Sequence, residues 1–94
     1  MDLNRALGRA LRELRQSKGL SQESIGASQS YISDVERGIK TLSVEKLEEF
    51  AINIGVHPVT LLTKCYLIKN DDINSEMLLA TVHNELENFS KQKE

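Results

Sequence analysis

The chain has 94 residues, of which 39% are hydrophobic and 28% charged, and its formal net charge is −2 at pH 7. These values fit one small folded domain with an extension, and no apolar run approaches the ~18 residues of a membrane-spanning helix. The amino-terminal stretch lacks the continuous apolar segment of a secretory signal, and the single cysteine, Cys65, cannot form an internal disulfide. We therefore expect a cytoplasmic protein that does not associate with a membrane.

The charges are unevenly distributed along the chain. Residues 1–47 carry eight Lys/Arg and six Asp/Glu, whereas residues 48–94 carry four and eight. A basic half followed by an acidic half points weakly to a partner-binding first half, and chance explains the same asymmetry about equally well.

The first predicted element is an amphipathic helix. Apolar residues recur at helical spacing over residues 3–14, and arginines occupy the opposite side. Asp2 is the expected N-cap, and Lys18 followed by Gly19 is a typical helix stop.

Two very short helices are predicted next, on either side of a small-residue break at residues 26–27. Ser21 is the expected N-cap of the first, which contains one large apolar residue, Ile25. Ser28 is the expected N-cap of the second, which ends at Gly38.

Three further helices are expected after this pair. The first begins after Ser43 and ends at Gly55, and Pro58 stands at the first position of the next, which runs to residue 69. The buried stripe expected for the helix after Ser43 comprises Val44, Leu47, Phe50, Ala51 and Ile54. The last helix is expected over about residues 73–90, with an apolar stripe that comprises Leu78, Leu79, Val82, Leu86 and Phe89. This stripe needs to be buried, either against the preceding helix or against a second copy of the chain.

Three stretches, LRELRQSKGLSQES, SQSYISDVERG and SVEKLEEFAINIGVHPVTLL, together resemble the XRE family of helix-turn-helix proteins, to which the lambda and 434 repressors and Cro belong. The resemblance covers about two-thirds of the chain. It implies an all-α fold in which residues 1–69 form a compact five-helix repressor-like domain. Residues 70–94 then supply a sixth, C-terminal helix for packing or dimerisation. It also implies that Arg15 pairs with Glu36, tying the first helix to the third.

The function implied is that of a sequence-specific DNA-binding transcriptional regulator. Its recognition helix, about residues 28–37, would enter the major groove of double-stranded DNA. Regulators of this type usually read two half-sites about one DNA turn apart, which requires a dimer, so a homodimer is expected.

Short polar side chains begin the expected recognition helix, so its backbone can approach the base edges closely. Gln29 can pair bidentately with adenine, and Ser30 can bond to several bases. Gln22 lies at a helix N-terminus, where a phosphate is favoured, and Arg37 and Lys40 flank the end of the recognition helix.

The resemblance adds further residues to this set. Ser33 and Asp34 stand where family members read bases or nearby backbone, Tyr31 stands where some members touch DNA, and Ser28 stands at a usual phosphate contact. The full predicted set is Gln22, Ser28, Gln29, Ser30, Tyr31, Ser33, Asp34, Arg37 and Lys40.

Two features depart from the family pattern. About four residues are missing between Gln22 and the glycine turn, which is close to one helical turn and shortens the first helix of the motif by ~6 Å. The apolar phase is kept, and Ile25 can replace two of the usual aliphatic residues. The placement of Gln22 on the DNA backbone is therefore left open. The second departure is Asp34, which either accepts from cytosine N4 or is repelled by phosphate.

Other residues have plainer interpretations. Arg5, Arg9 and Arg12 are most simply a solvated helix face, with a DNA phosphate contact as the alternative. His57 is an N-cap or turn residue, and Cys65 is a small buried residue. The sequence contains no catalytic triad, carboxylate pair or glycine-rich phosphate loop, so we expect no enzyme activity, cofactor, metal or small-molecule ligand.

The rival hypothesis is a protein-interaction or antitoxin-like module with little autonomous DNA binding. Its partner surface would be the acidic half, residues 48–94.

Overall fold

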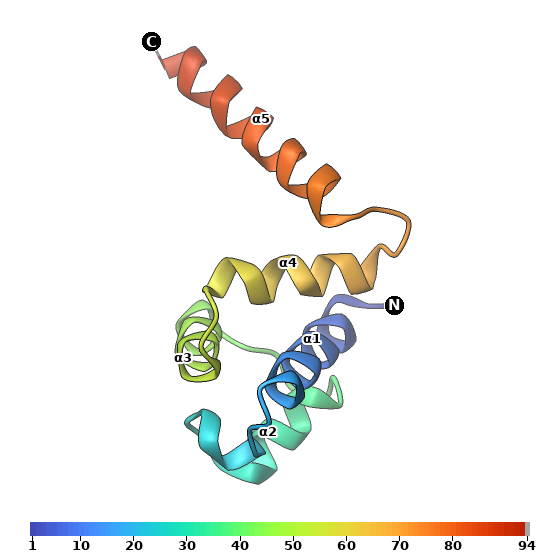
Figure 1. Cartoon of the computed structure of the whole chain (residues 1–94), viewed down its shortest axis with the longest axis vertical. Coiled ribbons are helices and arrows are strands. Elements are labelled where there is room, and N and C mark those ends of the chain that lie inside the picture. The colour runs from blue at the N-terminus through green and yellow to red at the C-terminus, as the bar shows by residue number, and fades with distance from the viewer. Residues whose placement is uncertain (94) are drawn as a thin grey trace.

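The computed structural model describes residues 1–93, with side chains to residue 91, as helices joined by short loops (Figure 1). The elements are α1 (Leu3–Ser17), the 3₁₀ helix η1 (Gln22–Ile25), α2 (Gln29–Glu36), α3 (Val44–Ile54), α4 (Pro58–Lys69) and α5 (Ser75–Lys93). No strand occurs among these residues, so the predicted all-α class is confirmed.

Capping side chains start the helices at the predicted places. Asp2, Ser28, Ser43 and His57 each accept a hydrogen bond from a backbone N–H in the first turn of the following helix. Each such cap stabilises a helix by about 0.5–2 kcal/mol, because it satisfies a donor that has no partner within the helix. Pro58 occupies the first turn of α4, where its missing N–H costs nothing.

One hydrophobic core joins α1 to η1, α2, α3 and α4. Its buried members are Ala6, Leu7, Ala10, Leu11, Ile25, Ile32, Val35, Phe50, Ala51, Ile54, Leu61 and Cys65. Burial raises the pKa of the Cys65 thiol, so this side chain is a neutral member of the core, as predicted. Val44 is an exception to the prediction, because it is 84% exposed at the first position of α3, outside the core.

A glycine allows α1 and α2 to pack closely. A Cβ atom at Gly8 would collide with the carbonyl oxygen of Val35 and lie 2.8 Å from that of Glu36. The end of α2 therefore rests directly on the backbone of α1, which fixes α2 on the domain.

The last helix points away from the domain in Figure 1 and packs against α4. It begins two residues later than predicted because the Asn74 side chain caps it, accepting from the Met77 N–H at 2.9 Å. It also ends three residues later than predicted, at Lys93.

Among the described helices, none is by itself long and apolar enough to cross a membrane. Taken together, α3 and α4 pass that test by length and composition only, with a bend of 103° between them.

Candidate DNA-binding surface

The predicted helix-turn-helix is formed by η1 and α2. Its first helix is a single 3₁₀ turn of four residues, too short to be stable alone. Contacts with the rest of the domain hold it: Ile25 is fully buried, and Asn53 of α3 donates from Nδ2 to the Ile25 carbonyl at 3.0 Å. Gly26 then turns the chain toward α2 with a φ of 105°. The missing helical turn is thus compensated by α3.

A nearly buried ion pair joins α1 to the end of α2, as the family resemblance implied. Arg15 Nε lies 2.7 Å from Glu36 Oε2, Arg15 Nη2 lies 3.0 Å from Oε1, and the two side chains are 10% and 4% exposed. The hydrogen bonds to Glu36 raise the pKa of the Arg15 guanidinium. The third donor, Arg15 Nη1, binds the Leu20 carbonyl at 2.8 Å, so the pair also holds the loop before η1.

Gln22 belongs to the same network. Its Nε2 donates to Glu36 Oε1 at 3.0 Å, so the glutamine predicted to touch a phosphate is held by the end of α2. This link joins residues that are 14 apart in the sequence, and no local pattern predicts it. The short η1 therefore has a defined position relative to α2.

The predicted residues fall into two groups by exposure. Ser28, Gln29, Ser30, Arg37 and Lys40 are exposed, at the beginning of α2 and just after its end. The partly buried residues are Gln22, Tyr31, Ser33 and Asp34.

The buried side of α2 explains why the exposed group faces outward. Ile32 and Val35 are both fully buried, so the helix is fixed by that side. Gln29 and Ser30 stand at its free amino end. They are placed where a recognition helix presents side chains to base edges.

Tyr31 and Asp34 surround Lys40. The Tyr31 ring packs edge-on against Phe50 at 6.2 Å between centroids, and Lys40 Nζ lies 5.5 Å from the Tyr31 centroid. Asp34 lies 3.5 Å from Lys40 and 3.9 Å from Arg37. The acid is therefore paired with cations, which weakens its repulsion of a phosphate.

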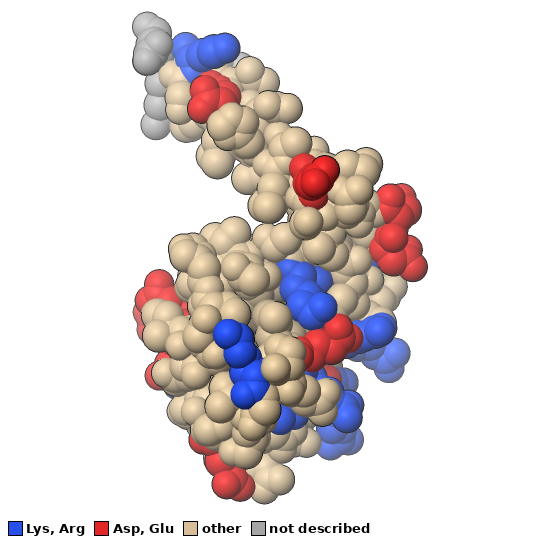
Figure 2. Space-filling view, viewed as in Figure 1, with Lys and Arg blue, Asp and Glu red and all other residues tan. Residues whose placement is uncertain are grey.

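The charge distribution separates two parts of the molecule. Most of the basic side chains visible in Figure 2 lie on the domain, whereas the charged side chains visible on the linker before α5 and on α5 are mainly acidic. A polyanion such as double-stranded DNA is accordingly attracted to the domain more than to α5, where the acidic side chains repel it.

Comparisons with known proteins agree with this architecture. Residues 11–61 match the family model described as Helix-turn-helix. Over 67 residues the chain is 40% identical to the HTH-type transcriptional regulator y4dJ of Sinorhizobium fredii, an overlap that covers 67% of this chain and 87% of that protein.

Two solved structures are similar in fold and sequence. The clp gene regulator ClgR from Corynebacterium glutamicum matches with a TM-score of 0.66 and 27% identity, over 99% of this chain and 95% of that one. The restriction-modification controller protein C.AhdI from Aeromonas hydrophila matches with a TM-score of 0.58 and 38% identity, over 61% of this chain and 92% of that one. The chain thus belongs to the XRE-type helix-turn-helix family of DNA-binding transcriptional regulators.

Proposed function

We propose that the protein regulates transcription as a homodimer that places one copy of α2 in each of two successive major grooves of double-stranded DNA. The observation that carries this proposal is the free, polar amino end of α2, where Gln29 and Ser30 are exposed while Ile32 and Val35 anchor the opposite side. An eight-residue helix is about 12 Å long, and the major groove is about 12 Å wide. Arg37 and Lys40 lie beyond the end of α2, in position to contact phosphates.

In this proposal the residues divide into those that read bases and those that bind backbone. Gln29→Ala is expected to relax the preference at one base position, at a cost of about 1–3 kcal/mol on the preferred site. Arg37→Ala is expected to weaken binding evenly across sequences, because it removes a phosphate contact. Both expectations, the relaxed base preference of Gln29→Ala and the even loss of affinity of Arg37→Ala, are checked in two steps. Bound sites are selected from random DNA, and affinities are then measured on variants of the selected site.

Asn84→Ala is the control for these two variants, because it removes an exposed amide on α5, away from α2. It should leave both affinity and base preference unchanged. Equal losses on every site from Gln29→Ala and Arg37→Ala would contradict the division of roles.

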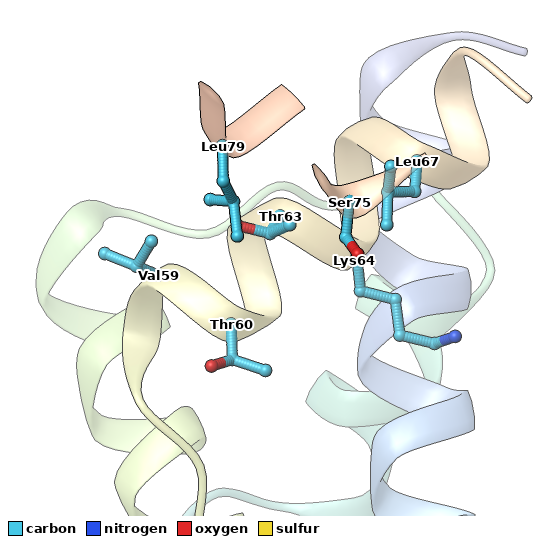
Figure 3. Close-up of a pocket in the computed structure, with 7 residues that line it drawn as sticks. All are labelled: Val59, Thr60, Thr63, Lys64, Leu67, Ser75 and Leu79. Carbon is cyan, nitrogen blue, oxygen red and sulfur yellow. The ribbon is translucent and has the colours of Figure 1, made fainter. Parts of the chain in front are cut away.

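The dimer is proposed to form through the face shared by α4 and α5. A groove of about 380 Å³ between these helices is lined by Val59, Leu62, Thr63, Tyr66, Leu78, Leu79 and Val82. Figure 3 shows the junction of the two helices, where Leu79 of α5 reaches toward Thr63 of α4. Farther along α5, Leu86 is 62% exposed, so the apolar side of this helix extends beyond α4. A second copy of the same face would bury these side chains in a two-fold arrangement.

Val82→Glu is expected to shift the protein from dimer to monomer, because it places a charge at the centre of this apolar face. Asn84→Glu adds the same charge on the opposite side of α5 and should leave the dimer intact. Sedimentation at several protein concentrations measures both variants. A parent protein that stays monomeric at high concentration would exclude the dimer.

The rival function is a protein-interaction module, and the apolar face of α4 and α5 is the feature that favours it. Under that hypothesis the face binds a different protein, and binding to random DNA at low salt is absent. A DNA-binding regulator instead binds random duplexes with an affinity that falls as salt rises, with a slope set by its phosphate contacts.

A further inference from the structure

We propose that a pocket on one flank of α4, where α5 crosses it, binds a small amphipathic carboxylate, a molecule with one carboxylate group and a short apolar chain. The pocket has a volume of about 370 Å³ and is lined by side chains of α4 and of the first turns of α5 (Figure 3). Small-molecule sites have volumes of about 300–1,000 Å³, so this one suits a small ligand. The site goes beyond the proposed function, and it differs from the expectation of no small-molecule ligand because its residues come together only where α5 crosses α4.

The pocket lies on the other side of this crossing from the groove proposed for dimerisation. The wall between the two is formed by the residues that line both, which are Val59, Thr63 and Leu79. Thr60 and Lys64 line only the pocket, whereas Leu62 and Tyr66 line only the groove. At about 100° per residue, these two pairs fall on opposite sides of Thr63 around α4. A ligand in the pocket therefore leaves the groove open.

The apolar part of the pocket suits a short hydrocarbon chain. Val59 of α4 and Leu79 of α5 are exposed although both are large apolar side chains, and Leu67 is only partly buried. An apolar chain lying between them would remove this surface from water, which is the main favourable contribution in such sites.

The polar part of the pocket has hydrogen-bonding groups to spare. The hydroxyl groups of Thr60, Thr63 and Ser75 form hydrogen bonds with none of the residues that the structure describes. A hydroxyl group can donate to a carboxylate oxygen, which accepts through two oxygens with several lone pairs. These three hydroxyl groups come from both helices, so a ligand that used them would join α5 to α4.

Lys64 supplies the positive charge that favours a carboxylate over a neutral group. Its Nζ lies 3.1 Å from Glu13 Oε1, and Glu13 Oε2 lies 2.7 Å from Arg9 Nε. The hydrogen bonds from Arg9 and Lys64 lower the pKa of the Glu13 carboxyl, so it is shared as an anion by two cations and the group keeps a net positive charge. The acidic side chains of the linker and of the first turn of α5 are exposed and do not line the pocket, so water and salt screen their repulsion.

The test uses octanoate as the probe and follows the backbone amide signals of the full chain by nuclear magnetic resonance. Octanoate is expected to shift the signals of Thr60, Lys64 and Ser75 in a saturable way, with a dissociation constant of about 1 mM or lower. Octanol has the same chain without the charge, and acetate has the charge without the chain. Each is expected to bind about tenfold more weakly, because it lacks one of the two contributions.

The variants Lys64→Gln and Lys46→Gln separate the pocket from the general charge of the protein. Lys64→Gln is expected to weaken octanoate binding about tenfold, through the loss of a charge-assisted contact. Lys46→Gln removes the same charge from a similar pair on α3, where Lys46 Nζ lies 3.2 Å from Glu49, and should change the affinity by less than about twofold. Thermal unfolding of both variants should stay close to that of the parent, because surface ion pairs contribute little to stability.

Four results would overturn the proposal. The absence of any saturable shift with octanoate would exclude the pocket as a site for such ligands, and equal affinities for octanoate and octanol would exclude a carboxylate as the recognised group. Equal losses in Lys64→Gln and Lys46→Gln would show that only the overall charge matters. Shifts confined to Leu62 and Tyr66 would place the probe in the groove instead. All these measurements are made without DNA, so a failure of the proposed DNA-binding function would leave them unaffected.

Discussion

Glu36→Ala is expected to lower the free energy of unfolding by about 3–5 kcal/mol, because it leaves the Arg15 guanidinium unpaired in a nearly buried site. The carboxylate accepts from Arg15 at 2.7 and 3.0 Å and from Gln22 at 3.0 Å, so three hydrogen bonds are lost together. Urea unfolding of the variant and the parent measures the difference. DNA affinity should fall as well, because this pair holds α2 on α1.

The double variant Arg15→Met/Glu36→Leu distinguishes an unpaired charge from a lost attraction. It removes both charges and fills the site with apolar groups, so it should recover most of the stability lost in Glu36→Ala. Glu13→Ala provides a surface comparison, since Glu13 is 40% exposed and pairs with Arg9 and Lys64. Such pairs contribute at most about 1 kcal/mol. If Glu36→Ala cost no more than Glu13→Ala, the Arg15–Glu36 pair would not be buried as described.

Gly8→Ala is expected to lower the free energy of unfolding by about 2 kcal/mol, although alanine is the better helix former. The new methyl group would collide with the carbonyl oxygens of Val35 and Glu36, which are backbone atoms and cannot rotate aside. Overpacking of this kind costs up to about 3 kcal/mol, from which about 1 kcal/mol of helix propensity is recovered. Chemical unfolding measures the change.

Gln16→Ala is the matched control on the same helix, because this exposed position should change stability by no more than about 0.5 kcal/mol. A stabilised Gly8→Ala protein would show that α1 and α2 do not approach as closely as described. Partial displacement of α2 should also reduce the affinity for DNA without changing the preferred sequence.

The parts of the fold that local chemistry decides were predictable from the sequence. Asp2, Ser28 and Ser43 mark helix starts because a capping side chain bonds to an N–H only three residues away. Gly55 marks a helix end because its φ of 95° is strained for other residues. These signals need no knowledge of the tertiary structure.

The features that were not predictable depend on residues far apart in the chain. Val44 has the spacing of a buried residue, but it precedes the part of α3 that meets the core. Arg12 has the pattern of a solvated helix face, and only the convergence of α1 with η1 and α2 places it beside Gln22 and Glu36. The apolar stripe of α5 was predicted, yet what covers it is not encoded in the spacing of its own residues.

The hydrogen bond from Asn53 to the Ile25 carbonyl has a consequence for the transfer of this motif between proteins. In a helix-turn-helix with a full-length first helix, the two helices can support each other. Here the single turn of η1 depends on a side chain 28 residues away, on a helix outside the motif. Residues 21–38 are therefore not expected to keep their structure in another protein that lacks a helix equivalent to α3. A chimera that carried them into another scaffold would keep the hydrogen bond from Gln22 to Glu36, but it would also need a helix in the place of α3 that presents an amide to the carbonyl before the glycine turn.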